Sequence, residues 1–180
     1  MAQQRRRIDQ VMDESFTQDL EDMAIDELRS RRGVCDDLDT ELSYYRRMLH
    51  GRMDLLDFEL RRRSGEETRS IIDALPEILA DSPSGRTSNP LDRELSLDLP
   101  ELAGGGKREV DQALSDGFLA RLPTTDVEEL RTIREVLSET EGLVSEQRRA
   151  VYNAHDVITA EITRRYREGS ASADEFLSTQ

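Results

Sequence analysis

The sequence is poor in the residues that build large cores and covalent cross-links. Its 180 residues include no tryptophan, and aromatic residues make up 4% and hydrophobic residues 36% of the chain. That apolar content is low for a multilayer globular core, but it suffices for two or three helices that pack through a narrow apolar stripe. Cys35 is the only cysteine, which excludes an internal disulfide and a cysteine-based metal site.

Positive charge is also scarce. The chain has 39 acidic and 25 basic residues, which gives a formal net charge of -14. Such a protein repels DNA phosphates, so we predict no direct DNA binding, and a direct transcription regulator is disfavoured. A basic protein is a better partner for this charge. Lys107 is the only lysine, so nearly all cations are arginines, which are planar, bidentate donors.

Long hydrophobic runs are missing as well. No segment is apolar and long enough to cross a membrane, and no apolar segment follows Arg5–Arg7 as it would in a signal peptide. We therefore predict a cytoplasmic protein without membrane contact. His50 and His155 fit no metal-binding pattern, and no residue set supports nucleophilic or acid–base catalysis, so neither a metal site nor an enzyme is expected.

What the chain does have is helical periodicity. Apolar residues recur every three or four positions along two long segments, which predicts an all-α fold with two long helices in an antiparallel coiled coil and short accessory helices. The first seam consists of Leu38, Leu42, Tyr45, Leu49, Met53, Leu56 and Leu60. The second consists of Leu130, Ile133, Leu137, Val144, Val151, Ile158 and Ile162.

Glycine and proline residues, which interrupt regular structure, divide the chain into five expected segments. Residues 1–18 form a flexible N-terminal segment, and residues 19–63 hold a short helix, ended or kinked at Gly33, and the first coiled-coil helix. Residues 64–107 hold a short helix, weakened by Pro76, and a Ser/Pro/Gly-rich linker. Residues 108–168 hold another short helix and the second coiled-coil helix, and residues 169–180 form a polar tail.

Two sets of five polar residues recur at one spacing on the two predicted long helices. Their offsets of 0, 4, 7, 11 and 15 fall within an arc of about 80° on an α-helix, so each set forms one stripe over about four turns. The first set is Asp39, Ser43, Arg46, His50 and Asp54. The second set is Glu141, Ser145, Arg148, Tyr152 and Asp156.

The chemistry of each stripe suits a guanine nucleotide. A guanidinium donates two parallel hydrogen bonds to guanine N7 and O6, and a carboxylate accepts from N1–H and N2–H₂. The His or Tyr ring can stack on the purine, and Ser and Arg can bind phosphate. A simpler interpretation remains open, because Arg and Glu often alternate on exposed helices, and duplication of a helical hairpin would repeat them without any ligand.

The two sets resemble the signature of the RsiG family of actinobacterial anti-sigma factors. That signature is Glu-x3-Ser-x2-Arg-x3-Gln-x3-Asp, once on each helix of an antiparallel coiled coil. The resemblance implies that the protein binds cyclic di-GMP and with it sequesters a WhiG-like, flagellar-type sigma factor, which represses sporulation transcription. It also implies one half-site of Asp39, Ser43, Arg46 and Asp54, and another of Glu141, Ser145, Arg148 and Asp156.

The chain departs from the signature at three positions. Asp39 replaces the first Glu, and His50 and Tyr152 replace Gln. Both rings retain hydrogen bonding and stacking, so we include them among the expected ligand-binding residues. The alternative hypothesis is a ligand-free coiled-coil adaptor or structural interaction protein, which would oligomerise through its leucine seam.

Overall fold

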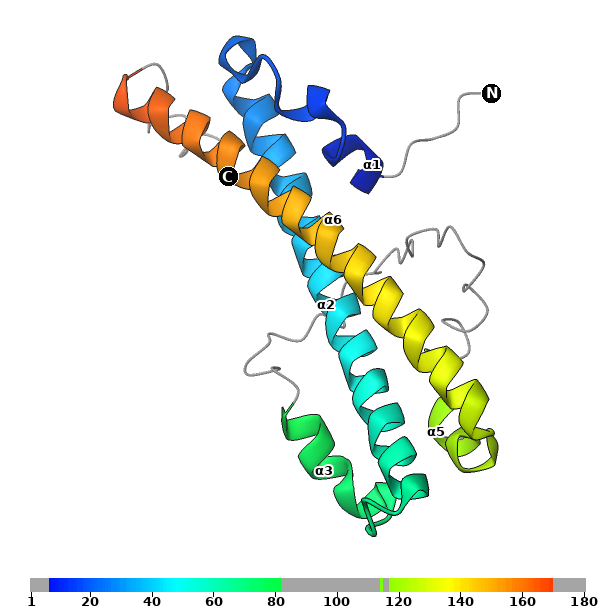
Figure 1. Ribbon diagram of the computed structural model, residues 1–180. Coiled ribbons are helices and arrows are strands. Elements are labelled where there is room, and N and C mark those ends of the chain that lie inside the picture. Colours follow the sequence, from blue (N-terminus) through cyan, green and yellow to red (C-terminus); the bar gives the residue numbers. More distant parts are fainter. Residues whose placement is uncertain (1–6, 82–113, 115–116, 170–180) are drawn as a thin grey trace. The chain divides into compact units, whose positions relative to one another are not determined.

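The computed structural model describes residues 7–81, 114 and 117–169, and all the regular structure in these ranges is helical (Figure 1). No strand occurs in them, which confirms the all-α prediction. The α-helices are α1 (Arg7–Val11), α2 (Ile25–Ser64), α3 (Ile71–Asp81), α5 (Phe118–Arg121) and α6 (Val127–Arg167). The 3₁₀ helices are η1 (Glu14–Thr17), η2 (Leu20–Asp22) and η4 (Leu122–Thr124).

The chain divides into two compact units, and each contains part of α2 and part of α6. Unit 1 comprises Met1–Leu42 and Glu146–Gln180, and unit 2 comprises Ser43–Ser145. In unit 1, Arg29 donates to the Tyr166 hydroxyl. In unit 2, Arg134 binds Asp57. Within each unit these pairings join an early residue of one helix to a late residue of the other, so the two segments run antiparallel.

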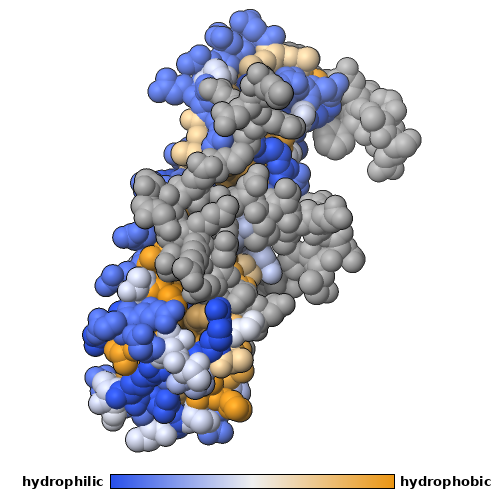
Figure 2. Space-filling view, turned by 90° about the vertical axis from the view of Figure 1, so that its right-hand side faces the viewer, coloured by the Kyte–Doolittle hydropathy of each residue, from blue (hydrophilic) through white to orange (hydrophobic). Residues whose placement is uncertain are grey.

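The predicted seam forms the core of each unit. Leu38, Leu42, Val151, Ile158 and Ile162 are buried in unit 1, and Tyr45, Leu49, Leu56, Leu130, Ile133, Leu137 and Val144 are buried in unit 2. Met53 and Leu60 are the exceptions, because both remain partly exposed. Hydrophilic residues predominate over much of the coloured surface in Figure 2, as expected when a narrow stripe supplies the core.

The N-terminal segment is more ordered than predicted. Residues 7–17 form α1 and η1 rather than a flexible stretch, and Ile8 and Val11 are buried. These two apolar side chains lie three residues apart, so they share one helix face. Asp13 caps η1 by accepting a hydrogen bond from the Ser15 backbone amide at 3.0 Å. The prediction for residues 1–6 lies outside the described residues.

Gly33 does not end a helix. One helix, α2, begins at Ile25 and continues through Gly33, so the prediction of a short helix over 19–31 followed by a second one was wrong. A glycine in a helix interior costs only about 0.5–1 kcal/mol relative to alanine. Leu28 and Cys35, which flank Gly33, are fully buried, and their burial outweighs that cost.

The accessory helices agree only in part with their predictions in the described residues. The helix expected over 66–79 begins at Ile71, where the Ser70 hydroxyl accepts from the Asp73 amide, and it continues through Pro76. For the helix expected over 108–122, the structure describes α5 (Phe118–Arg121) followed by η4. The predicted linker, from Ser82 onwards, and the polar tail, from Ser170 onwards, lie outside the described residues. The second long helix agrees with its prediction within one residue.

The two halves of the chain repeat one another at a constant offset. The first residues of α2 and α6, Ile25 and Val127, lie 102 positions apart (127 minus 25), and so do those of η2 and η4. The repetition therefore includes the turns that lead into the long helices, in addition to the polar stripes.

An arginine latch repeats with the same offset. In unit 2, Arg63 donates to the backbone oxygens of Leu122 at 2.7 Å and Thr125 at 2.6 Å, while its Nε binds Glu59 at 2.7 Å. In unit 1, Arg165 donates to Leu20 and Met23, both at 2.5 Å, while its Nε binds Glu161 at 2.8 Å. Each latch ties the end of one long helix to the turn that enters the other.

Removing one latch should destabilise the protein. Arg63→Ala leaves two backbone oxygens without their donor and removes one of two arginines that bind the buried Glu59 carboxylate. We expect the free energy of unfolding in urea to fall by about 1–3 kcal/mol. Arg61→Ala removes an exposed neighbour and should change it by at most about 0.5 kcal/mol. Equal losses in the two variants would contradict the role of the latch.

The glycines of α2 provide a second stability test. Gly33 lies in the helix interior with open space where a Cβ would stand, so Gly33→Ala should raise the free energy of unfolding by about 0.5–1 kcal/mol. Gly65, which follows α2, has φ of +86°, so Gly65→Ala should lower it by about 1 kcal/mol. Urea unfolding of both variants checks the pair, and destabilisation by Gly33→Ala would contradict a regular helix there.

Candidate ligand-binding site

The structure groups the ten expected site residues by unit rather than by helix. The ten side chains project from α2 and α6, and each unit takes members from both motifs. Unit 1 contains Asp39, Arg148, Tyr152 and Asp156. Unit 2 contains Ser43, Arg46, His50, Asp54, Glu141 and Ser145. Each unit therefore contains members of both motifs, and the half-sites expected from the resemblance stay a prediction.

In unit 2 the centre of this arrangement is the Glu141 cluster, which consists of Glu141, Arg46, His50 and Ser145. The Glu141 Oε1 atom accepts from Arg46 Nε at 3.0 Å and from Ser145 Oγ at 2.7 Å. It also lies 3.2 Å from His50 Nε2. One carboxylate oxygen of α6 is thus held by two side chains of α2 and one of its own helix.

The cluster keeps its carboxylate ionised. Partial burial raises the pKa of Glu141, but the hydrogen bonds from Ser145, Arg46 and His50 and the charge of Arg46 more than offset this and lower the pKa to about 2. Glu141 is therefore an acceptor at every physiological pH. Guanine N1–H and N2–H₂ are donors of the type that such an acceptor binds.

Arg46 presents its donors to solvent in a fixed orientation. Its Nε atom is bound to Glu141, and 33% of its side chain is exposed. Within the described parts of the chain, its two terminal nitrogens make no hydrogen bond or ion pair. A guanidinium held in this way is oriented by one contact and still offers a pair of parallel N–H groups, the geometry of a bidentate contact.

Unit 1 holds the corresponding Asp39 cluster, which consists of Asp39, Arg148 and Tyr152. Arg148 Nε donates to Asp39 Oδ1 at 2.8 Å, and its Nη2 donates to the Tyr152 hydroxyl at 2.5 Å. The guanidinium carbon lies 4.6 Å from the centre of the Tyr152 ring, a distance typical of cation–π contact. The ring is partly exposed, so its outer surface can stack on a flat ligand.

The two clusters are reciprocal. The first acid of each motif binds the arginine of the other motif, because Asp39 corresponds to Glu141 and Arg46 to Arg148 under the 102-residue offset. At the ring position, His50 contacts the Glu141 carboxylate, and Tyr152 donates to Asp39 at 3.4 Å and also packs against Arg148. Each motif alone predicts a stripe on one helix, and only the fold reveals that the acid and the arginine pair across helices.

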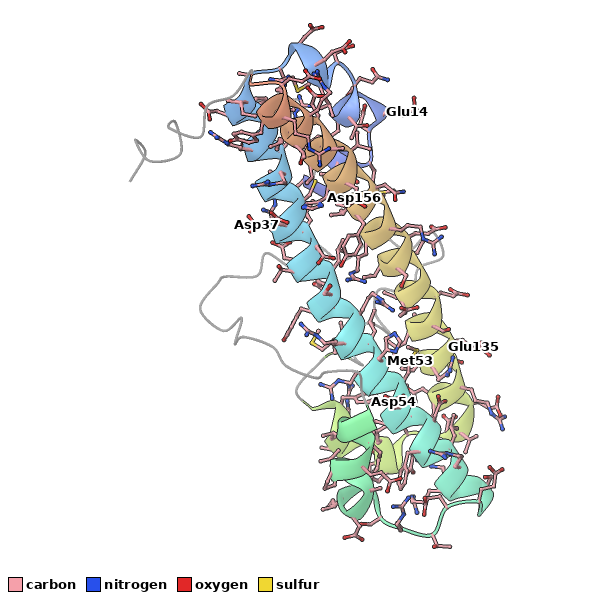
Figure 3. All side chains as sticks on the ribbon, turned by 90° about the vertical axis from the view of Figure 1, so that its left-hand side faces the viewer. Glu14, Asp37, Met53, Asp54, Glu135 and Asp156 are labelled. Carbon is pink, nitrogen blue, oxygen red and sulfur yellow. The ribbon has the colours of Figure 1, made fainter. Side chains whose placement is uncertain are left out.

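The last acids of the motifs lie in other surroundings (Figure 3). Asp54 and Phe58 of α2 line a groove of about 390 Å³ together with Ile78 of α3. Asp156, on α6, is largely exposed and lies 3.3 Å from His155 Nδ1. His155 also lies 3.4 Å from Asp36, a contact that the sequence motif does not indicate.

Comparison with known proteins identifies the family. A family model described as RsiG-like matches residues 14–79 and 116–180, which is more than half of the chain. The chain belongs to the RsiG-like family. The two matched stretches of this RsiG-like protein begin 102 residues apart, at the same offset as the structural repeat.

Membership in the RsiG-like family indicates the role of an anti-sigma factor. Together with the all-helical fold, it indicates a regulator rather than an enzyme. No curated protein sequence matches this RsiG-like chain. None of its helices in the described ranges combines the length and the hydropathy needed to cross a membrane.

The low pKa of Glu141 predicts how acid affects stability. Its folded pKa of about 2 lies below the ordinary 4.5, so the ionised form favours the folded state. This contribution is complete above pH 4.5 and is lost as the pH falls from there towards 2. Urea unfolding at a series of pH values should therefore show a smaller loss of stability on acidification for Glu141→Gln than for the wild type.

An exposed acid on the same helix provides the control for this pH series. Glu139→Gln removes a carboxylate two residues away, outside the Glu141 cluster, and should leave the pH dependence as in the wild type. If Glu141→Gln and Glu139→Gln give the same curve, the ionised Glu141 does not stabilise the fold.

Proposed function

We propose that this RsiG-like protein is an anti-sigma factor that binds cyclic di-GMP through the Glu141 and Asp39 clusters. With the nucleotide bound, it sequesters a WhiG-like, flagellar-type sigma factor and so represses sporulation transcription. The observation that carries the proposal is the reciprocal pairing, in which an acid and an arginine from opposite helices meet in each unit.

The donors and acceptors of the clusters match guanine. The exposed terminal nitrogens of Arg46 suit N7 and O6 of the base, and the ionised Glu141 suits N1–H and N2–H₂. Cyclic di-GMP has two guanines, and the chain has two clusters. The same kind of contact to guanine is therefore available twice.

The remaining motif residues supply stacking and phosphate contacts. His50 and Tyr152 occupy equivalent positions beside the two arginines, and a planar ring there stacks on a purine. Ser43 and Ser145 lie one turn before the arginines, and a hydroxyl there can rotate to donate to a phosphate oxygen; for Ser145 this exchanges its hydrogen bond to Glu141 for one to the ligand. Asp54 and Asp156 complete the set at the far end of each stripe.

The charge of the chain fits the proposed partner. Sigma factors bind DNA through basic surfaces, and a protein with a net charge of -14 competes with DNA for such surfaces. A nucleotide that binds only the complex stabilises it by mass action, by about 2.7 kcal/mol when its concentration is 100 times its dissociation constant. The intracellular nucleotide level would thereby control sequestration.

Loss of either motif arginine should weaken the response to nucleotide. We expect Arg46→Ala and Arg148→Ala each to weaken nucleotide-dependent complex formation by about 5-fold to 150-fold, since a bidentate base contact contributes about 1–3 kcal/mol. Calorimetric titration of cyclic di-GMP into the protein mixed with the sigma factor measures the effect, and circular dichroism checks that helicity is retained.

The adjacent arginines are matched controls for this experiment. Arg47→Ala and Arg149→Ala remove the same side chain one position away, off the motif stripe, and should leave nucleotide binding intact. Unchanged nucleotide binding in both Arg46→Ala and Arg148→Ala would refute the proposed site.

A ligand-free adaptor is the second candidate, and one observation favours it. The acid–arginine pairs between α2 and α6 are complete without a ligand, as expected if their role is to fix the register of the helices. Thermal melting separates the two candidates, because an adaptor shows no shift with cyclic di-GMP, whether or not the sigma factor is present.

A further inference from the structure

One face of α6 differs from its counterpart on α2. Leu55 and Phe58 of α2 are 3% and 1% exposed, whereas the residues 102 positions later, Val157 and Ala160, are both exposed, Val157 by 48%. The same position of the repeat is thus core in unit 2 and surface in unit 1. The exposed side chains of Val157 and Ala160 are apolar.

Unit 2 has an accessory helix on this side of α2. Figures 1 and 3 both show α3 alongside the second half of α2, and Phe58 lines a groove together with Ile78 of α3. Ala74 of α3 is buried. In the described residues of unit 1, no helix takes the place of α3, and that difference accounts for the exposure of Val157 and Ala160.

The exposed face of unit 1 forms one side of a groove of about 370 Å³. Val157 and Ala160 line it from α6, and Thr17 and Leu20 line it from the N-terminal turns. Val157, Ala160 and Leu20 are thus the apolar part of a lining that also contains polar and charged side chains.

The rim of this groove is acidic. Glu161 and Arg164, both at the groove, are paired with each other at 2.8 Å, and Arg164 also binds Glu168 at 2.5 Å. Asp19 and Glu21 are exposed carboxylates on either side of Leu20, with Glu21 in the electrostatic field of Arg164, and the exposed Asp156 precedes Val157. A helix that enters the groove therefore meets apolar contacts in the middle and negative charge at the sides.

We propose that this groove, lined by Val157, Ala160, Thr17 and Leu20, binds an amphipathic helix of the sigma factor. The apolar residues of that helix pack on Val157 and Ala160, and its arginines or lysines pair with Asp19 and Glu21. The inference rests on the proposed function, because it assigns a docking surface to that same partner. The position of α3 in unit 2 is the precedent within this chain for a helix on this face.

The test measures the affinity of the full-length protein for the purified sigma factor at saturating cyclic di-GMP. Val157→Asp places a charge in the apolar part of the groove and should weaken the complex by about 10-fold or more. Ile72→Asp, at a more exposed apolar position on α3, is the matched control and should bind as the wild type does. Thermal melting of both variants checks their folding.

A second variant tests the acidic rim without touching the apolar surface. Asp19→Asn combined with Glu21→Gln should weaken the complex by about 3-fold to 10-fold and make its affinity less dependent on salt, because two ion pairs are lost. Wild-type affinity in both this variant and Val157→Asp would overturn the proposal.

Two further results separate this inference from its alternatives. If the wild type forms no nucleotide-dependent complex, the proposed function fails, whereas a normal wild-type complex that both variants leave intact refutes only the docking surface. Deletion of residues 170–180 tests whether the chain's own C-terminal segment occupies the groove. A lower melting temperature on this deletion and on Val157→Asp, with sigma-factor affinity unchanged, would assign the groove to that segment and overturn the proposal.

Discussion

The pairing of a carboxylate on one long helix with an arginine on the other is the interaction on which the account of this protein depends. Glu141 binds Arg46, and Asp39 binds Arg148, in positions that the 102-residue repeat makes equivalent. Each pair is only partly shielded from solvent, so its contribution to stability is modest, on the order of 1 kcal/mol or less. Its larger effect is to orient a guanidinium and an ionised carboxylate side by side at the surface.

The duplication explains why the two units are similar, and the differences between them indicate where their roles diverge. The latches at Arg63 and Arg165 share two equivalent backbone acceptors, and Arg165 also donates to the backbone oxygen of Glu21. The surfaces differ: α3 lies beside α2 in unit 2, whereas the equivalent face of α6 in unit 1 is open. A duplicated scaffold thus combines two similar acid–arginine clusters with one groove that exposes Val157 and Ala160.

Periodicity was sufficient to predict the two long helices, because burial of the seam determines where they run and turn residues determine where they end. It failed at Gly33, where the small cost of one glycine is outweighed by the burial of Leu28 and Cys35. It failed again at residues 7–17, where two apolar side chains in a polar segment were enough to form a packed turn. The sequence also predicts ten polar residues for the candidate site, and this assignment stays a prediction. It could not predict which of them meet, because the contacts between helices depend on the axial register of two segments that are far apart in the chain.

The most direct test of the central claim is the affinity of the wild-type protein for the sigma factor without nucleotide, with cyclic di-GMP and with cyclic di-AMP. The claim predicts that cyclic di-GMP tightens the complex by at least about 10-fold, or 1.4 kcal/mol. Cyclic di-AMP should have no such effect, because adenine carries an amino donor where guanine carries the O6 acceptor. Equal affinity under all three conditions, or equal tightening by both nucleotides, would contradict the claim that the acid–arginine pairs read guanine.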